Sequence, residues 1–307
     1  MTWTSAWQHR GPLRARTWGA LGALLAMACA PHRLEVVECV EACPDASGGT
    51  AGDSSGATGG ASTGGTAGEP PALFHESLLH RYDFEGSGTD VVDRVGDAHG
   101  TLIGTELTVD AEGRGAAVLA GRYIGQYIEL PSGIISGLHN ATFEAWVTWD
   151  GQRVWERILD FGDAFIGSDG AWLGSTYLFL TPRTPTSIGA LMRVGHKRLD
   201  LPELVMDAEA GLPVGTRTHV ALVVDNDRHV LQLFQNGQLV ATQAIVDRAG
   251  QSFHAFATLN DTSNWLGRSQ FEQDAFFGGT FHEFRIYGAA LSASEIAASA
   301  LRGPDPE

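Results

Sequence analysis

The sequence predicts an all-β protein, a two-sheet antiparallel β-sandwich with one short helix near the C-terminus. Three observations predict this class: short runs of β-branched and aromatic residues with alternating polarity, two-residue turns between such runs, and a single helix signature. The alternation is clearest in residues 142–149 (TFEAWVTW), where Phe143 and Val147 fall on one face and Glu144 and Trp146 on the other. Trp149 falls on the face of Phe143, so each face of the strand carries a tryptophan. We therefore expect that both faces are covered or that one binds a ligand.

The turns predict how neighbouring strands pair. Asn226-Asp227 and Asn236-Gly237 each separate two apolar runs, and Asn-Gly is the strongest short-range signal for a two-residue hairpin. Consecutive hairpins build an antiparallel sheet. Besides 142–149, the runs predicted as strands lie at 80–84, 157–161, 177–181, 190–194, 219–225, 230–235, 238–243 and 280–287.

One helix is expected near the C-terminus. Ser292 and Glu295 form a capping box ahead of residues 296–301, and the Gly303-Pro304 pair stops the helix. A short amphipathic helix that closes a β-domain is a structural element, so we assign it no function.

Residues 1–28 have the layout of a secretory signal peptide. Three arginines precede an apolar run at 19–28 (GALGALLAMA) that is too short to span a bilayer as a helix. The run leads into Cys29 through Ala26-Met27-Ala28, which resembles a bacterial lipobox, and acyl chains on Cys29 would supply membrane affinity. We expect an exported chain anchored in the membrane at the cell envelope or outer surface, with ordinary cleavage and secretion as the alternative.

The cysteine count agrees with lipidation. The chain holds 3 cysteines, an odd number for an exported protein. Lipidation of Cys29 in the anchor segment 29–43 leaves Cys39 and Cys43 as a pair that is free to close a small disulfide loop in an oxidising compartment.

The charge excludes nucleic acid as a partner. The chain carries 20 Lys and Arg against 36 Asp and Glu, for a formal net charge of -16, and Lys197 is its one lysine. A phosphate-binding protein needs a basic stripe to displace counterions. The sequence also lacks a Walker loop and a dinucleotide fingerprint, so we expect no nucleotide.

A change of composition divides the exported part. Residues 44–72 hold Gly, Ser, Thr and Ala without an aromatic residue, which predicts a disordered linker with a span of about 30 Å. Residues 73–303 hold most of the aromatic residues and all the predicted strands, so they are expected to form one domain, with 304–307 as a tail.

Several short blocks follow one another across residues 79–301. They are YDFEGSGT at 82–89, HGTL at 99–102, TFEAWV at 142–147, ILDFG at 158–162, YLFLTP at 177–182, THVA at 218–221, QNG at 235–237, NWLGRS at 264–269, and FRIY at 284–287 with ALS at 290–292. In this order they resemble the laminin-G-like jelly-roll domains of bacterial surface proteins, within the concanavalin A-like lectin/glucanase superfamily. The resemblance implies a jelly-roll sandwich that serves in binding, often of glycans.

The resemblance also implies one structural calcium in some members. The first two ligand positions match Glu85 and Asp93, but the third, an aspartate in the relatives, is His282 here. Neutral imidazole is a poor ligand for this hard cation. The alternative is that the loop with Glu85 and Asp93 binds no metal and serves in packing.

An enzyme is not expected. Glycoside hydrolases need two carboxylates about 5 to 9 Å apart that flank the bond to be cleaved. When both come from one face of one strand, as in enzymes of this fold class, the sequence shows a Glu-x-Asp-x-x-Glu spacing. No such run occurs in the sequence, and the neighbours of Glu144 at two-residue spacing are Thr142 and Trp146. Hydrolysis would need a partner carboxylate from another strand.

Aromatic side chains in loops are the candidate binding residues. Trp155 and Trp172 lie in or beside predicted loops, where an indole ring could stack on the apolar face of a sugar, whereas Trp265 of the NWLGRS block is expected in the core. We expect a non-catalytic, lectin-like sandwich that binds a glycan or glycoprotein. A structural or protein-interaction sandwich of the cell envelope is the alternative.

Overall fold

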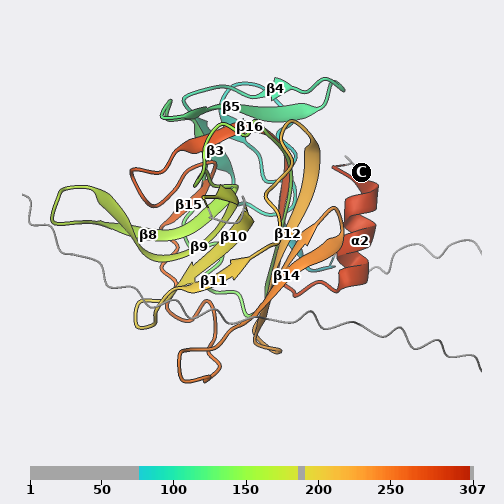
Figure 1. Cartoon of the computed structure of the whole chain (residues 1–307). Helices are drawn as coiled ribbons and strands as arrows, with labels where there is room; N and C mark the ends of the chain where they lie inside the picture. The colour runs from blue at the N-terminus through green and yellow to red at the C-terminus, as the bar shows by residue number, and fades with distance from the viewer. Residues whose placement is uncertain (1–75, 186–190, 305–307) are drawn as a thin grey trace, which may run out of the picture. The chain divides into compact units, whose positions relative to one another are not determined.

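The computed structural model describes residues 76–185 and 191–304, and these form two eight-stranded sheets (Figure 1). The first sheet contains β1 (Leu78–Tyr82), β4 (Thr108–Val109), β5 (Gly115–Arg122), β7 (Ala141–Trp149), β12 (Arg217–Asp225), β13 (Val230–Gln235), β14 (Gln238–Ala244) and β16 (Phe276–Tyr287). Its order is β14-β13-β12-β7-β16-β5-β4, and β1 also pairs with β16.

The second sheet contains the remaining described strands. They are β2 (Asp90–Val91), β3 (Gly100–Ile103), β6 (Tyr127–Leu130), β8 (Leu159–Ile166), β9 (Trp172–Thr184), β10 (Leu191–Lys197), β11 (Leu204–Asp207) and β15 (Ser263–Leu266), in the order β11-β10-β9-β8-β15-β6-β3-β2. Neighbouring strands pair antiparallel in both sheets. The predicted all-β, two-sheet antiparallel sandwich is confirmed.

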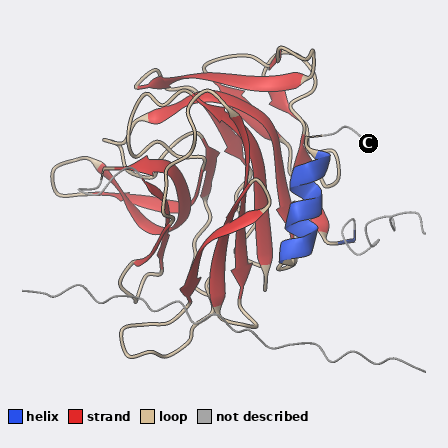
Figure 2. Cartoon of the chain, turned by 45° about the vertical axis from the view of Figure 1, so that its right-hand side comes forward, coloured by secondary structure: helices blue, strands red, loops and turns tan. Residues whose placement is uncertain are grey.

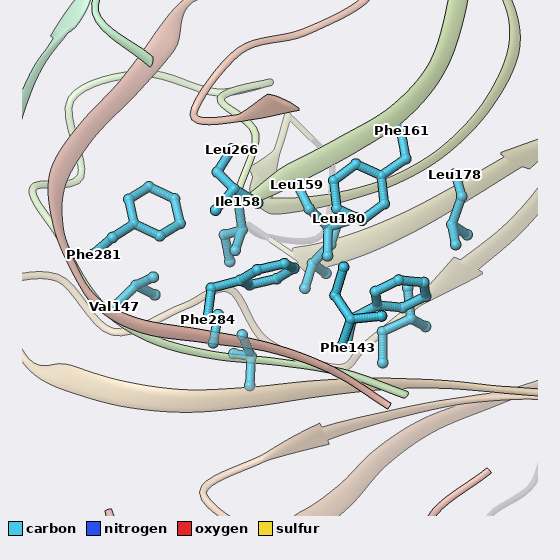
Figure 3. Close-up of a cluster of buried hydrophobic side chains, with 14 of the residues drawn as sticks. Phe143, Val147, Ile158, Leu159, Phe161, Leu178, Leu180, Leu266, Phe281 and Phe284 are labelled. Carbon is cyan, nitrogen blue, oxygen red and sulfur yellow. The ribbon is translucent and has the colours of Figure 1, made fainter. Parts of the chain in front are cut away.

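The core lies between the two sheets (Figure 3). Phe143 and Val147 of β7 project from the first sheet, and Phe161 of β8 meets Phe143 edge to face at 5.5 Å between ring centroids. Burial of apolar surface at about 25 cal/mol per Å² is the main force that holds the layers together. The alternation predicted for 142–149 therefore places Phe143 and Val147 in the core.

The outer face of the first sheet is covered by the helix α2 (Ala293–Arg302), as Figure 2 shows. The helix begins at the predicted capping box, where the Ser292 hydroxyl accepts from the Glu295 N–H and the Glu295 carboxylate accepts from the Ser292 N–H. It ends at Gly303, as expected. Ile296 packs with Phe234 and Tyr287 of the sheet, so both faces of this part of the sheet are covered.

The predicted Asn-Gly hairpin joins β13 to β14. Asn236 and Gly237 have φ angles of 48° and 77°, which are the positive values of a two-residue turn that follows the twist of the strands. A Cβ atom on Gly237 would lie 2.9 Å from the Ala297 Cα, so the turn also needs glycine for its contact with α2.

None of the helices in the described part of the chain is long and apolar enough to cross a membrane. The predicted signal peptide, the anchor at Cys29, the Cys39–Cys43 pair and the linker all lie outside the described residues. They remain predictions from the sequence.

Candidate functional site

A cavity of about 460 Å³ opens on the outer face of the second sheet. Leu266 at the end of β15 points into the core, so its neighbour Trp265 projects to the opposite face and into the cavity. The wall is completed by the β8–β9 hairpin and by the segment 268–276, which connects β15 to β16. The lining residues are Ala164, Trp172, Thr262, Ser263, Trp265, Arg268, Ser269, Gln270, Phe271, Glu272, Asp274 and Phe276.

The floor of the cavity is an aromatic layer with a guanidinium group on it. Trp265 meets Tyr127 of β6 edge to face, with 5.9 Å between ring centroids. The Arg268 Cζ lies 4.0 Å from the Trp265 ring centroid and 4.6 Å from that of Tyr127. At 9% exposure Trp265 is largely covered, and its Nε1–H donates to the Glu129 carboxylate at 3.4 Å. The floor therefore presents Arg268 rather than a bare indole face.

One wall is formed by Trp172 at the start of β9, whose side chain is 49% exposed. Its main-chain N–H donates to the Glu272 carboxylate at 3.0 Å, and its carbonyl accepts from the Glu272 N–H at 3.1 Å. Phe271 beside it packs edge to face on Tyr177 at 5.5 Å between ring centroids. The main chain of Trp172 is thus fixed by hydrogen bonds, while about half of its side chain stays exposed to solvent.

The segment behind the cavity is anchored by a buried ion-pair network. The Arg157 guanidinium donates to Asp160 at 3.1 Å and to Asp274 at 2.8 Å, and the Gln270 N–H donates to Asp160 at 3.1 Å. Burial raises the pKa of Asp160 to about 6, and the charge of Arg157 opposes that rise. Because Asp160 binds the Gln270 N–H and Arg157 binds Asp274, the loop that carries the lining residues has a fixed path.

The structure separates the two tryptophans that the sequence suggests as binding residues. Trp172 lines the cavity, but Trp155 is not among the lining residues. Trp155 is half-buried, and its ring lies beside the guanidinium groups of Arg193 and Arg157, at 5.6 and 5.9 Å from their Cζ atoms. Trp265 is buried, as expected, but on the cavity side of the sheet.

Glu85 and Asp93, the suggested calcium ligands, both hold backbone N–H groups. Glu85 accepts from the Gly115 N–H at 2.7 Å. Asp93 accepts from His80 at 2.7 Å and from the Arg81 N–H at 3.0 Å. Burial opposes ionisation of Asp93, but these hydrogen bonds outweigh it and lower the pKa of this carboxyl. Asp93 is therefore ionised and already supplied with donors.

His282, at the third ligand position, is also engaged. Its Nδ1 lies 3.2 Å from an Asp110 carboxylate oxygen and its Nε2 lies 2.9 Å from the Thr148 hydroxyl oxygen. The Arg114 guanidinium lines the same small cavity as Glu85 and His282 and pairs with Asp110 at 3.2 Å. In residues 76–185 and 191–304 there is no group of three His, Cys, Asp or Glu side chains arranged to hold a metal ion. These contacts give the three side chains a packing role in the described structure, and calcium at Glu85 and Asp93 stays a prediction from the sequence.

Glu144, the one strand carboxylate considered for hydrolysis, is fully buried beneath α2. It accepts hydrogen bonds from His219 at 3.1 Å, from the Tyr287 hydroxyl at 3.0 Å and from the Ser299 hydroxyl at 2.8 Å. Burial raises the pKa of Tyr287, and the charge of Glu144 raises it further, which keeps this donor protonated. A carboxylate in this position joins the helix to the sheet.

Comparison with known proteins places the fold. Domain 4 of an extracellular arabinanase from Geobacillus stearothermophilus, in complex with arabinotriose, is 22% identical over 72% of this chain and 97% of that chain, with a TM-score of 0.53. A Trypanosoma rangeli sialidase is 16% identical over 74% of this chain and 33% of that chain, with a TM-score of 0.50. At these identities the likeness shows the fold. No curated protein matches the sequence.

The family is shown by the sequence itself. The model of the concanavalin A-like lectin/glucanases superfamily matches residues 121–297, which is more than half of the chain. This range contains the β8–β9 hairpin, β15 and the segment 268–276, and therefore every residue that lines the cavity. The chain belongs to the concanavalin A-like lectin/glucanases superfamily.

Proposed function

We propose that the chain is an exported, lipid-anchored surface protein whose sandwich binds a glycan in the cavity on the second sheet without cleaving it. The observation that carries the proposal is the exposed indole of Trp172 in the same cavity as the polar groups of Arg268, Gln270 and Glu272. A sugar ring offers an apolar face for an indole and hydroxyl groups for polar side chains, so this combination suits a saccharide.

The fold supports the same class of ligand. The arabinanase domain with this fold is in complex with arabinotriose and is the fourth domain of that enzyme. A cavity of about 460 Å³ lies within the common range for small-molecule sites and has room for one or two sugar units.

The carboxylates in the cavity support a non-catalytic role. Asp274 accepts hydrogen bonds from Arg157 at 2.8 Å and from the Ser269 hydroxyl at 2.9 Å, so its charge is compensated by the protein. Glu272 accepts from the Trp172 N–H. A hydrolase needs one carboxyl group free to protonate a leaving group and a second aimed at the anomeric carbon. In the described residues, both cavity carboxylates instead hold the loop in place.

Binding is tested by glycan arrays and polysaccharide pull-downs with the full chain. We expect retention of at least one class of oligosaccharide, with binding that free oligosaccharide of the same class competes away. Blank arrays and pull-downs, together with co-purification of a protein partner, would contradict the proposal.

Cleavage is tested separately by incubation with mixed polysaccharides. We expect no new reducing ends. Turnover that Glu272→Gln or Asp274→Asn abolishes, with the variant still folded, would make the protein a hydrolase and overturn the non-catalytic part of the proposal.

The export and anchor part rests on the arginines ahead of the apolar run 19–28 and on Cys29. It is tested by intact-mass analysis of the membrane fraction from cells that express the full chain. We expect a species that begins at Cys29 and carries acyl chains. A mature chain in the soluble fraction without the mass of acyl chains would contradict the anchor and favour ordinary cleavage and secretion.

A protein-interaction role has one observation in its favour. Phe165 and Ile166, at the tip of the β8–β9 hairpin, are 51% and 62% exposed. Adjacent exposed apolar side chains at a hairpin tip suit a protein surface. Cross-linking at Ser168→Cys in this tip, followed by identification of a single envelope protein, would favour this second candidate.

A further inference from the structure

We propose that the cavity selects acidic saccharides, with the Arg268 guanidinium binding the carboxylate or sulfate group of the sugar. This inference rests on the proposed function, since it names the class of glycan that the same cavity takes. It starts from an arginine whose guanidinium N–H groups find no acceptor among the described residues.

Arg268, which lines the cavity, differs from Arg157 behind it. Arg157 donates to two carboxylates, whereas no oxygen atom of the described residues accepts a hydrogen bond from the Arg268 guanidinium. The contacts of Arg268 are with the rings of Trp265 and Tyr127. This half-buried guanidinium has five N–H donors, and none of its nitrogen atoms is among the buried polar atoms without a partner in the described residues, so the donors are open to solvent or to a ligand. An anionic group of a ligand would satisfy them.

The stacking prepares Arg268 for such a ligand. The Arg268 Cζ lies 4.0 Å from the Trp265 centroid and 4.6 Å from the Tyr127 centroid, so both rings attract the cation. This cation–π attraction holds the long side chain in one place, and it uses no oxygen acceptor of the described residues. Little conformational entropy is then lost when an anion binds.

The backbone also fixes the position of Arg268. It follows Gly267, whose φ of +86° turns the chain out of β15. The Gly267 N–H donates to the Ile158 carbonyl at 3.4 Å, and its own carbonyl accepts from the Phe277 N–H at 2.9 Å. The residue that carries the guanidinium is therefore part of the sandwich frame rather than of a free loop.

The acidic groups around the cavity do not occupy Arg268. Glu129 accepts from the Trp265 indole, Glu272 from the Trp172 N–H, and Asp274 from Arg157. In the part of the chain that the structure describes, Arg268 forms no ion pair, so its charge is not neutralised although the whole chain carries a net charge of -16. The cavity thus places one unpaired cation beside the exposed indole of Trp172.

A carboxylate and a sulfate share the chemistry that fits this cation. Both offer two oxygens to the planar guanidinium fork in a bidentate pair, which is stronger and more directional than a neutral hydrogen bond. A carboxylate would come from a uronic or sialic type of sugar, and a sulfate from a sulfated neutral sugar. The test therefore contains one arm for each.

The experiment is a calorimetric titration of the full chain with three oligosaccharides of equal length. One is neutral, one is its uronic-acid counterpart, and one is its sulfated counterpart. We expect at least one acidic form to bind about tenfold more tightly than the neutral form, as one charge-assisted bidentate pair would give. Whichever acidic form shows the preference identifies the source of the anion.

Two variants assign that preference to Arg268. Arg268→Gln is expected to remove it, whereas Arg248→Gln, a change of the same charge at an exposed position outside the cavity, is expected to preserve it. Thermal unfolding of both variants shows that they are folded at the titration temperature.

The outcomes separate the two proposals. Equal affinities for the neutral and acidic forms, or a preference that survives Arg268→Gln, would overturn the assignment to Arg268 and leave glycan binding intact. If none of the three oligosaccharides binds and the arrays are also blank, both proposals fail.

Discussion

Trp172 and Glu272, 100 positions apart in the sequence, hold each other through two hydrogen bonds: the Trp172 N–H donates to the Glu272 carboxylate at 3.0 Å, and the Glu272 N–H donates to the Trp172 carbonyl at 3.1 Å. This pair joins the β8–β9 hairpin to the segment that leads into β16. Because both bonds use the Trp172 main chain, its indole stays available at the cavity.

Replacing Trp172 by alanine should weaken glycan binding by about five- to tenfold, because a stacking surface worth about 1 kcal/mol is removed. Stability should change little, since the side chain is half exposed and its main-chain bonds remain. Titration with the oligosaccharide retained on the array measures the change. The matched control is Trp155→Ala, outside the cavity, for which we expect the wild-type affinity. Equal losses in the two variants would place the binding surface elsewhere.

Replacing Gly267 by alanine should lower the free energy of unfolding by about 3 kcal/mol. The residue has a φ of +86°, and a Cβ there would lie 2.6 Å from the buried Leu119 Cδ1. Gly250→Ala is the control, because Gly250 has a φ of +78° but open space around it, so only the backbone strain of about 1 kcal/mol applies. Urea unfolding of both variants measures the difference. Equal costs would mean that the contact with Leu119 relaxes freely.

Replacing Glu144 by alanine should destabilise the protein by about 3 kcal/mol, because the buried donors of His219, Tyr287 and Ser299 lose their acceptor. The exposed Glu106 provides the control, and Glu106→Ala should stay within about 0.5 kcal/mol of wild type. Urea unfolding followed by tryptophan fluorescence measures both. A stable Glu144→Ala protein would show that this network does not hold α2 on the sheet.

Acidification should destabilise the folded protein through His196. Burial lowers the pKa of His196 to about 4, although its hydrogen bond to the Ala255 carbonyl at 2.8 Å acts in the other direction. In the unfolded chain His196 is protonated below a pH of about 6.5, whereas in the folded chain it is protonated only below about 4. The neutral, buried His196 therefore contributes to stability above 6.5, and this contribution is lost as the pH falls toward 4. Asp160, with a pKa raised to about 6, acts in the opposite sense.

The His196→Gln variant isolates this contribution. Between a pH of about 7 and about 5, wild type should lose about 2 kcal/mol more of its free energy of unfolding than the variant does. Urea unfolding at the two pH values gives both differences. If wild type and variant respond alike to pH, His196 does not keep a depressed pKa in the folded state.

The alternating pattern and the turns were enough to predict the class of the fold. Residues 142–149 and the Asn236-Gly237 turn lie where expected, because both signals are local. The strand Gly115–Arg122 was missed. Its sequence, GAAVLAGR, is rich in Gly and Ala, and its place in the sheet comes from pairing with β16. Tertiary pairing, rather than intrinsic propensity, makes such a segment a strand.

The candidate site was predictable only in part. Trp172 could be suggested because a tryptophan stands beside a predicted loop. Arg268, Phe271 and Glu272 gave no such signal, since segment 268–276 has no periodicity and its path depends on the contact of Gln270 with Asp160, 110 positions away. The NWLGRS block does put Trp265 and Arg268 three positions apart, and with Trp265 known to face outward this spacing could have drawn attention to Arg268.

The central claim, that a glycan binds in the cavity beside Trp172, is tested most directly by hydrogen–deuterium exchange of the full chain with and without the oligosaccharide that the array retains. The account predicts slower exchange in the amides of residues 164–173 and 262–276, the two segments that line the cavity. Protection confined to other segments, such as the loops between β12, β13 and β14, or no change with bound oligosaccharide, would contradict it.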